Sequence, residues 1–437
     1  MKLKSLAIIA LGLICSAVAF SQEKVDSLDL HEQRISLVED GILQMKKLKF
    51  SGYIQAQWQS SQLDSLGKAS KDMKNGIGVN GPEKAAGVTD YNRFGVRRGR
   101  LKATYEDFNC QAVIEFDISE GNGTTYLKTK DVYLNVLDPW LNTFAVKGGV
   151  FDNPFGYEIG YSSSKLESPE RSRLIQALFP DEKTLGAMLT IQAPKTSPWN
   201  VLKLEAGLVA GNAIGKDYKS KKDFVGHLTY TNSTASIKYG VGVSLYSGYI
   251  LQTNANVYSI NNGAFVLDNT ASNLNSFANR SYFGLDGQFS IASDLGLSSI
   301  RAEFISGTQP GTSGSVSSPN VYDPTTAAAA DTYIRKVSGG YINFVQDIAD
   351  TKHSIVIKYD WFDPNTDIAG GTVGTGAKTG LADMAYSTLG LGYMYRMNNN
   401  VRIMAYYDIV SNETVKVKGY YTNVNDNLVT VRFQYKF

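Results

Sequence analysis

Apolar and polar residues alternate along most of the chain, and this pattern predicts β-strands. In residues 48–59, LKFSGYIQAQWQ, Ile54 and Trp58 belong to one row, and Gln55 and Gln57 belong to the other. Alternation with a period of two gives a strand one apolar and one polar face. A soluble sheet buries the apolar face in a core, whereas an outer-membrane barrel turns it to lipid and encloses the polar face.

The same alternation recurs in sixteen segments. They are residues 48–59, 94–105, 108–118, 128–137, 143–151, 184–193, 201–210, 223–230, 235–247, 281–290, 298–306, 338–346, 353–362, 384–395, 401–410 and 428–437. Most of them have the length of a tilted membrane strand.

The connections between these segments alternate between long and short. The long ones are 60–93, 119–127, 152–183, 211–222, 248–280, 307–337, 363–383 and 411–427, and the short ones are 106–107, 138–142, 194–200, 231–234, 291–297, 347–352 and 396–400. Short periplasmic turns and long outer loops produce this sorting in a barrel. An even number of strands places both ends of the barrel in the periplasm.

Charged residues in mid-strand decide which face is wet, because an unpaired buried charge is too costly for a dry core. These residues are Lys102, Glu115, Asp117, Lys147, Lys238, Glu303, Lys358, Asp360 and Arg432. We therefore predict an all-β fold, a 16-stranded antiparallel transmembrane β-barrel over residues 48–437. Its apolar row faces outer-membrane lipid, and its interior is wide enough for a channel.

The amino-terminal residues 1–21 read as a signal peptide. Lys2 and Lys4 precede a short apolar run, and Ala17 and Ala19 offer cleavage positions. We expect export through the Sec pathway to the outer membrane of a Gram-negative bacterium. Residues 22–47 carry apolar positions seven apart, which predicts a short periplasmic helix or a coiled coil between subunits.

Composition narrows the function classes. Two of the 43 basic residues fall in the signal peptide, so the mature chain balances 41 bases against 41 acids. This balance gives no support to nucleic-acid binding. Cys110 alone remains after cleavage, so an intramolecular disulfide is impossible.

The order of several motifs resembles the family of phosphate-selective porins O and P. The motifs are NRFGVRRGRLKATYE (92–106), KDVYLNV (130–136), VKGGVFDNPFGYE (146–158), SPERS (168–172), GGYINFVQDI (339–348), IVIKYDWFD (355–363) and VTVRFQYKF (429–437). The resemblance implies a sixteen-stranded barrel, usually a homotrimer, that passes small anions through a constriction lined by arginine and lysine. It places the family's arginine pair at Arg97 and Arg98, and it suggests that the loop 152–183 folds into the lumen.

Parity along the strands, together with the loop 152–183, supplies the candidate anion-contacting residues. Arg98, Arg100 and Lys102 are consecutive on one inward face, with Arg97 near the rim. The full set of candidates is Arg97, Arg98, Arg100, Lys102, Lys147, Arg171, Arg173, Lys183, Lys238 and Arg301. Rings of arginine and lysine favour anions in a pore. The alternative is that these bases pair with Glu115, Asp117 and Asp131 on neighbouring strands.

These patterns lead to a porin for small hydrophilic solutes, with a preference for anions such as phosphate. A general non-selective porin is the alternative, and a hydrophobic-solute transporter or an outer-membrane enzyme is less favoured. A transporter of that kind needs an apolar lumen, and no nucleophile with a base stands out for an enzyme. We expect no cofactor and no metal site.

Overall fold

The computed structural model describes residues 34–35, 37–38, 46–63, 68–78, 90–121, 124–215, 217–318, 330–376, 378–424 and 426–437. The chain divides into two units, Met1–Lys49 and Phe50–Phe437. The predicted signal peptide lies outside the described residues. Within 22–47, the described residues 34–35, 37–38 and 46–47 are helical. The coiled coil stays a prediction.

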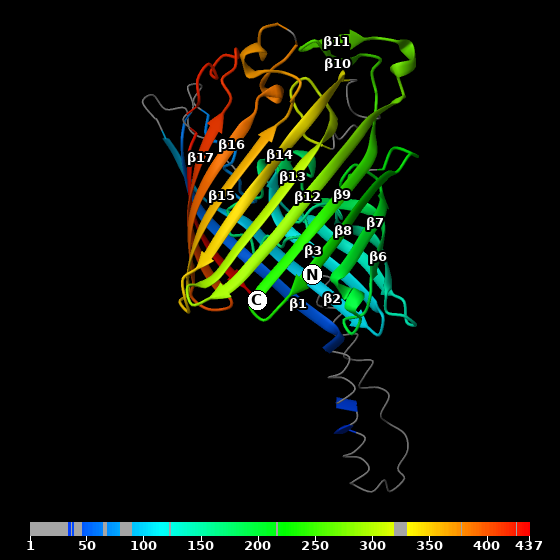
Figure 1. Cartoon of the computed structure of the whole chain (residues 1–437), viewed down its shortest axis with the longest axis vertical. Coiled ribbons are helices and arrows are strands. Elements are labelled where there is room, and N and C mark those ends of the chain that lie inside the picture. The colour runs from blue at the N-terminus through cyan, green and yellow to red at the C-terminus, as the bar shows by residue number, and fades with distance from the viewer. Residues whose placement is uncertain are drawn as a thin grey trace, which may run out of the picture. The chain divides into compact units, whose positions relative to one another are not determined.

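The described residues form one sheet of eighteen strands (Figure 1). Its strands are β1 (Leu48–Gln62), β2 (Asp90–Asp107), β3 (Cys110–Gly121), β4 (Thr124–Leu137), β5 (Phe144–Asp152), β6 (Lys183–Gln192), β7 (Leu202–Val209), β8 (Asp223–Ser233), β9 (Ile237–Leu251), β10 (Val257–Asn261), β11 (Ala264–Asp268), β12 (Phe277–Ser293), β13 (Gly296–Gly311), β14 (Thr332–Asp347), β15 (His353–Asp363), β16 (Tyr386–Arg396), β17 (Val401–Asn412) and β18 (Leu428–Lys436). Leaving aside the hairpin of β10 and β11, the other sixteen described strands are those of the barrel, so the predicted strand number is confirmed.

The barrel closes where its last strand meets its first. β18 pairs antiparallel with β1, and the register aligns Tyr53 with Lys436. Gly52 and Phe437 exchange two backbone hydrogen bonds of 3.0 Å. This pairing leaves neither the first nor the last strand with a free edge, and closure is the condition for a sheet that spans a membrane.

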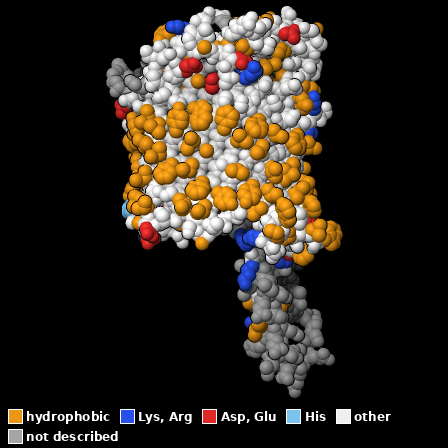
Figure 2. Space-filling model, viewed as in Figure 1, with side chains coloured by type: hydrophobic (Ala, Val, Ile, Leu, Met, Phe, Trp, Pro, Cys, Tyr) orange, Lys and Arg blue, Asp and Glu red, His pale blue; other side chains and the backbone are white. Residues whose placement is uncertain are grey.

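The two rows of each strand separate as the alternation predicts. In β1, Gln55 is 0% exposed on the inner face, and Ile54 is 50% exposed on the outer face. Figure 2 shows the outer apolar side chains as a belt across the face of the barrel in view. The apolar face of residues 48–59 therefore faces lipid, and the polar face lines the interior.

One of the predicted long connections was wrong, and another contains a hairpin that was not predicted. Residues 119–121 and 124–127 belong to β3 and β4, which pair up to Gly121 and Thr124, because their Ser, Thr and Tyr side chains extend the ladder. The connection 248–280 contains the hairpin β10–β11, and Tyr258 of β10 stacks on Tyr333 of β14 with ring centroids 4.5 Å apart.

The described helices are short: α3 (Arg173–Leu178), and the 3-10 turns η1 (Pro198–Val201), η2 (Ala271–Asn273), η3 (Gly370–Thr372) and η4 (Leu381–Asp383). Among the described residues, none of these helices has the length and apolar character needed to cross a membrane. α3 belongs to the connection between β5 and β6, which holds the candidate site.

Candidate functional site

The connection between β5 and β6, residues 153–182 and here named the inner loop, contacts several walls of the barrel interior. Glu158 binds Lys358 of β15 at 2.7 Å, and the backbone oxygen of Pro169 accepts a hydrogen bond of 2.7 Å from Arg432 of β18. Gln55 of β1 donates to the Ser163 backbone oxygen at 3.2 Å. The inner loop starts and ends at β5 and β6, and β15 lies about half of the barrel's strands away, so the loop crosses the interior.

An apolar cluster attaches one side of the inner loop to the barrel wall, and we name it the apolar anchor. Its members are Phe155, Ile159, Leu174, Ile175, Ala177, Leu178 and Phe179 of the inner loop, with Val209, Val225, Tyr246, Tyr282, Ile305, Val316, Val337 and Phe362 around them. Phe155 is fully buried and lies 5.0 Å from Phe179, measured between ring centroids. Part of the interior is therefore dry, beside the charged side chains that the alternation places inside.

Gly156 holds the inner loop close to this wall. Its φ of +63° is unfavourable for other residues. A Cβ atom there would lie 1.8 Å from a carboxylate oxygen of Glu303 on β13. The turn NPFG thus needs glycine for both its backbone conformation and its contact with the wall.

The opposite wall, formed by β2, β3 and β4, is basic because the alternation breaks twice. Arg97 and Arg98 are neighbours in β2, yet both side chains bind Glu170 of the inner loop. In β4 the register shifts so that Lys130 is the extra residue, and Lys130 and Asp131 are both buried. Such bulges turn consecutive side chains to one face of a sheet. Arg97 therefore faces the interior. The sequence pattern had predicted a position near the rim instead.

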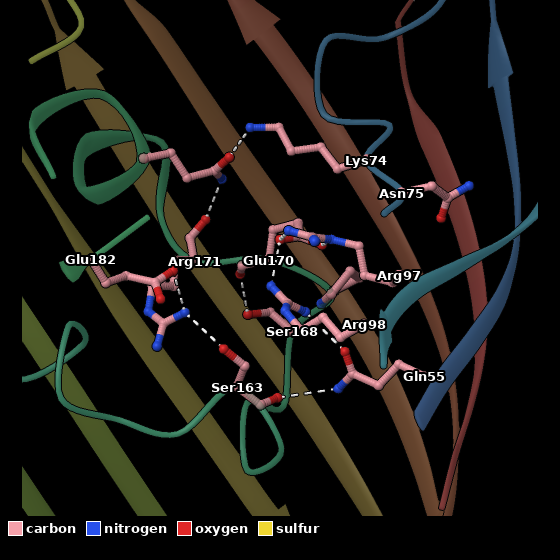
Figure 3. A network of polar contacts seen from close by, with 12 residues as sticks. Gln55, Lys74, Asn75, Arg97, Arg98, Ser163, Ser168, Glu170, Arg171 and Glu182 are labelled. Carbon is pink, nitrogen blue, oxygen red and sulfur yellow. Dashed lines mark hydrogen bonds and ion pairs between the residues drawn. The ribbon is translucent and has the colours of Figure 1, made fainter. Parts of the chain in front are cut away.

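Glu170 gathers three arginines from two strands (Figure 3). Its carboxylate oxygens lie 2.5 Å from Arg97 Nε, 3.0 Å from Arg98 Nη2 and 3.3 Å from Arg432 Nη2. Arg98 also donates to Gln55 Oε1 at 2.9 Å. One carboxylate thus holds the inner loop against β2 and β18.

The surroundings of Glu170 fix its ionisation. Burial alone would raise the pKa of its carboxyl group, but Arg97, Arg98 and Arg432 together lower that pKa well below its usual value. Nearby charges of opposite sign favour the ionised form. Glu170 therefore remains negatively charged at neutral pH.

A cavity of about 420 Å³ lies between the inner loop and the basic wall. Among the described residues, its basic lining side chains are Lys74, Arg97, Arg98, Arg100, Lys128, Lys130 and Arg171, and its acidic ones are Asp117, Glu170, Asp181 and Glu182. Seven bases against four acids give this cavity a positive excess. We name it the basic cavity.

Several predicted bases pair with the acids of the neighbouring strands. Arg100 binds Asp117 at 2.9 Å and lies 3.4 Å from Glu115. Lys183 binds Asp131 at 2.6 Å, and Lys102 lies 3.9 Å from the same carboxylate. The pairing alternative therefore holds for these three bases.

The other predicted residues are dispersed. Arg171 binds Glu182 at 2.7 Å within the inner loop, and Arg173 of α3 binds Asp72 at 2.6 Å. Arg301 of β13 binds Glu167 at 2.7 Å.

Lys147 and Lys238 lie apart from these pairs. The Lys147 ammonium group stands 4.7 Å from the ring centroid of Tyr133. Lys238 is exposed near the start of β9. The structure therefore brings Arg97, Arg98, Arg100 and Arg171 to the basic cavity and leaves the other predicted bases elsewhere.

Sequence reasoning missed three lysines of the basic cavity, namely Lys74, Lys128 and Lys130. Lys128 and Lys130 bind Asp181 at 2.6 and 3.6 Å. A pattern with a fixed period of two does not reveal a bulge, and with Asp131 inside it places Lys130 on the opposite face. Lys74 belongs to the connection 63–89, where alternation gives no information.

Among the described residues, no group of histidine, cysteine, aspartate and glutamate side chains is arranged to hold a metal ion.

No protein-family model matches the sequence, and no curated protein sequence matches it. Solved structures of outer-membrane proteins do match its fold. Pseudomonas putida OprB aligns with a TM-score of 0.55 at 9% identity over 94% of this chain and 97% of that chain. The outer membrane channel DcaP of Acinetobacter baumannii gives 0.52 at 11% identity over 89% and 97%. Salmonella typhi OmpF gives 0.51 at 10% identity over 89% and 97%.

Identities this low establish the shared fold alone. The closed antiparallel barrel, its apolar belt and its polar interior define the class of the protein, an outer-membrane β-barrel. Within that class its fold is that of the porin-type barrels.

Proposed function

We propose that the protein is a non-enzymatic porin, through which small hydrophilic solutes diffuse passively, and that it prefers anions. The observation that carries this proposal is the basic cavity, with its seven basic and four acidic lining side chains among the described residues. A positive lining lowers the free energy of an anion in the pore and raises that of a cation. The inner loop narrows the path, so solutes pass close to these charges.

A second cavity supports the same preference. It has a volume of about 590 Å³ and lies where the tip of the inner loop faces the short turns of β14–β15 and β16–β17. Its charged lining residues are the bases Lys165, Lys352, Arg396, Arg402 and Lys436 and the acids Glu167 and Asp347. Positive charge at both levels favours anions along the path.

Phosphate is the finer form of this proposal. Arginine presents a planar fork of donors that matches phosphate oxygens, and Arg97 and Arg98 reach the same point of the basic cavity. The resemblance of residues 92–106 and 168–172 to phosphate-selective porins supports this form. The homotrimer that this resemblance implies also stays a prediction.

A general porin without ion preference is the second candidate. It is favoured by the pairing of Arg100 with Asp117 and of Lys183 with Asp131, which neutralises bases that would otherwise attract anions. The sign and size of the selectivity separate the two candidates.

The test is the reversal potential of the purified protein in a planar bilayer under a KCl gradient, with and without phosphate. We expect chloride preference, and we expect phosphate to block the chloride current. The double variant Arg98→Gln, Lys130→Gln lowers the excess in the basic cavity from three positive charges to one. It should reduce the preference and weaken the block about tenfold, which corresponds to about 1.4 kcal/mol of binding free energy.

Lys195→Gln is the matched control, because Lys195 is exposed on the short turn between β6 and β7. It should leave the reversal potential unchanged. Cation preference in the unmodified protein would refute the anion proposal. Chloride preference that the double variant retains in full would show that the basic cavity is not its source.

A further inference from the structure

The wall of the barrel is incomplete at one seam, between the outer halves of β2 and β3. The ladder that joins these strands runs from Asp107 paired with Cys110 to Arg100 paired with Asp117, and stops there. Beyond it the backbone N–H of Gly99 donates to the Asp117 side chain at 3.0 Å instead of to β3 backbone. β2 continues to Asp90, so its outer half is not joined to β3.

Residues Gly76, Ile77 and Gly78 fill this seam, and we name them the wedge. Ile77 and Val96 of β2 exchange backbone hydrogen bonds of 2.9 and 3.2 Å. On the other side, the N–H of Glu120 in β3 donates to the Gly76 oxygen at 2.7 Å. The wedge therefore lies between the two strands as a short extra strand.

Among the described residues, five hydrogen bonds hold the wedge. Besides the three bonds described above, Gly76 donates to the Val96 oxygen at 2.9 Å, and Gly78 donates to the Glu120 carboxylate at 2.9 Å. A segment of three residues held mainly by hydrogen bonds opens at lower free energy than a continuous ladder. Displacing it would leave a gap roughly 10 Å high and wide, from the rise of three strand residues and two strand spacings.

The two sides of the wedge differ in chemistry. On the inner side, Gly76 belongs to the lining of the basic cavity, together with Arg97 and Arg98. On the outer side, Ile77 belongs to the lining of a lipid-facing groove of about 610 Å³ over β1, β2, β17 and β18. That groove is lined mostly by apolar side chains such as Trp58, Phe94, Val431 and Phe433. Phe94 is 80% exposed.

We propose that this seam is a lateral exit for a single-chain anionic amphiphile, such as an alkyl sulfate, phosphate or carboxylate. Its charged head occupies the basic cavity, and its alkyl chain passes through the displaced wedge into the apolar groove. The two environments match the two parts of such a molecule and lie on either side of one short segment. The width of the gap suits one alkyl chain and excludes a folded partner. The lateral exit uses the same basic cavity as the proposed porin, but it does not require the protein to conduct ions.

The test locks the wedge to its strand. In a Cys110→Ser background, Ile77→Cys and Val96→Cys place two thiols on directly opposed residues, at a separation that a disulfide can bridge. The matched control, Ala103→Cys with Ile114→Cys, cross-links the same two strands where their ladder is intact. Each protein is reconstituted into vesicles that enclose a trace of radiolabelled dodecyl sulfate, with albumin outside to bind what emerges.

We expect the reduced protein to accelerate the appearance of dodecyl sulfate on albumin above that of protein-free vesicles. Oxidation of the 77–96 pair should abolish the acceleration, and dithiothreitol should restore it. Oxidation of the 103–114 pair should change nothing. Equal rates in the oxidised and reduced 77–96 protein would overturn the proposal, because the amphiphile would then leave through the pore alone. Rates of transfer no faster than those of protein-free vesicles would also overturn the proposal.

Swelling of the same vesicles in KCl reports the porin separately. Swelling should persist in the oxidised 77–96 protein. Amphiphile transfer without swelling would refute the proposed porin and leave the lateral exit standing. Swelling without amphiphile transfer would refute the lateral exit and leave the proposed porin standing.

Discussion

Arg97 and Arg98 reach the same carboxylate although adjacent residues of a regular strand point to opposite faces. The break in alternation that allows this recurs at Lys130 and Asp131 in β4. Both breaks face the inner loop, and each brings a basic side chain to the interior that parity assigns elsewhere. Local irregularity of two strands thus sets the charge of the basic cavity.

At this scale we predict the effect of Glu170→Gln. The variant removes the carboxylate shared by Arg97, Arg98 and Arg432. Breaking a buried ion pair by removing one partner costs about 3–5 kcal/mol, so the free energy of unfolding should fall by roughly that amount. The reversal potential should move toward stronger anion preference, because one negative charge leaves the basic cavity. Chemical unfolding in vesicles and bilayer recordings measure the two effects.

The pH dependence of the effect of Glu170→Gln on the reversal potential provides the control for this prediction. Because the arginines hold the pKa of Glu170 below its usual value, its stabilising contribution is present above the unfolded pKa of about 4.3. That contribution is lost only as the pH falls through the lower, folded pKa. The difference in reversal potential between the unmodified protein and Glu170→Gln should therefore be constant from about pH 8 to about pH 5. A change of that difference within this window would contradict the assigned ionisation of Glu170.

At the scale of elements, the inner loop connects two different surfaces. Its apolar side packs on β8, β9 and β12–β14 through the apolar anchor, and its Glu170 side pairs with β2 and β18. The anchor includes Tyr246 and Tyr282, whose side chains are buried, and alternation does not say what such inward residues contact. Dry packing on one wall leaves the solvated path along the other.

We predict that Phe155→Ala loosens the inner loop. Truncating a fully buried phenylalanine typically costs about 3–5 kcal/mol, and here the loss falls on the contact between loop and wall. The expected result is a larger and noisier single-channel conductance, together with faster tryptic cleavage within residues 153–182.

Phe289→Ala is the matched control for Phe155→Ala. It removes the same side-chain atoms of a phenylalanine, but from the lipid face of β12, where Phe289 is exposed. It should leave the conductance unchanged. Equal conductance of the Phe155 variant and the unmodified protein would mean that the apolar anchor does not hold the loop in place.

At the scale of the whole molecule, the closed ladder of strands and the apolar belt suit the barrel to a lipid membrane. Closure between β1 and β18 pairs the first and last strands, and the belt crosses the face of the barrel seen in Figure 2. The basic cavity, the second cavity near the short turns and the wedge all depend on which strands closure brings together.

We predict that a charge on the belt destabilises the barrel and that the same charge inside does not. Leu285 of β12 is exposed on the lipid face, so Leu285→Arg should lower the free energy of unfolding by about 2–4 kcal/mol. Gln288 of the same strand is half-buried and bonds to Asp286 inside the barrel. Gln288→Arg should therefore change stability much less. Unfolding in denaturant measures both, and equal losses would contradict the assigned faces.

The sequence by itself determined the barrel. Alternation located all sixteen barrel strands and their faces, because the side-chain period of two is a property of every strand and does not depend on its neighbours. It also identified Arg98 and Arg100 as inward bases with acids opposite them. The hairpin β10–β11 went unpredicted, since short strands in a long loop carry too few alternating residues to be recognised.

Only the tertiary structure decided the content of the interior. The inward turn of Arg97, the bulge that admits Lys130, the dry contact of Phe155, and the wedge in the seam of β2 and β3 all arise where distant segments meet. A bulge or an inserted strand is fixed by the hydrogen bonds and packing that neighbouring elements supply. The pattern along one chain segment does not show which distant segments it will contact. The fold therefore follows from local periodicity, and the site follows from the contacts that closure brings about.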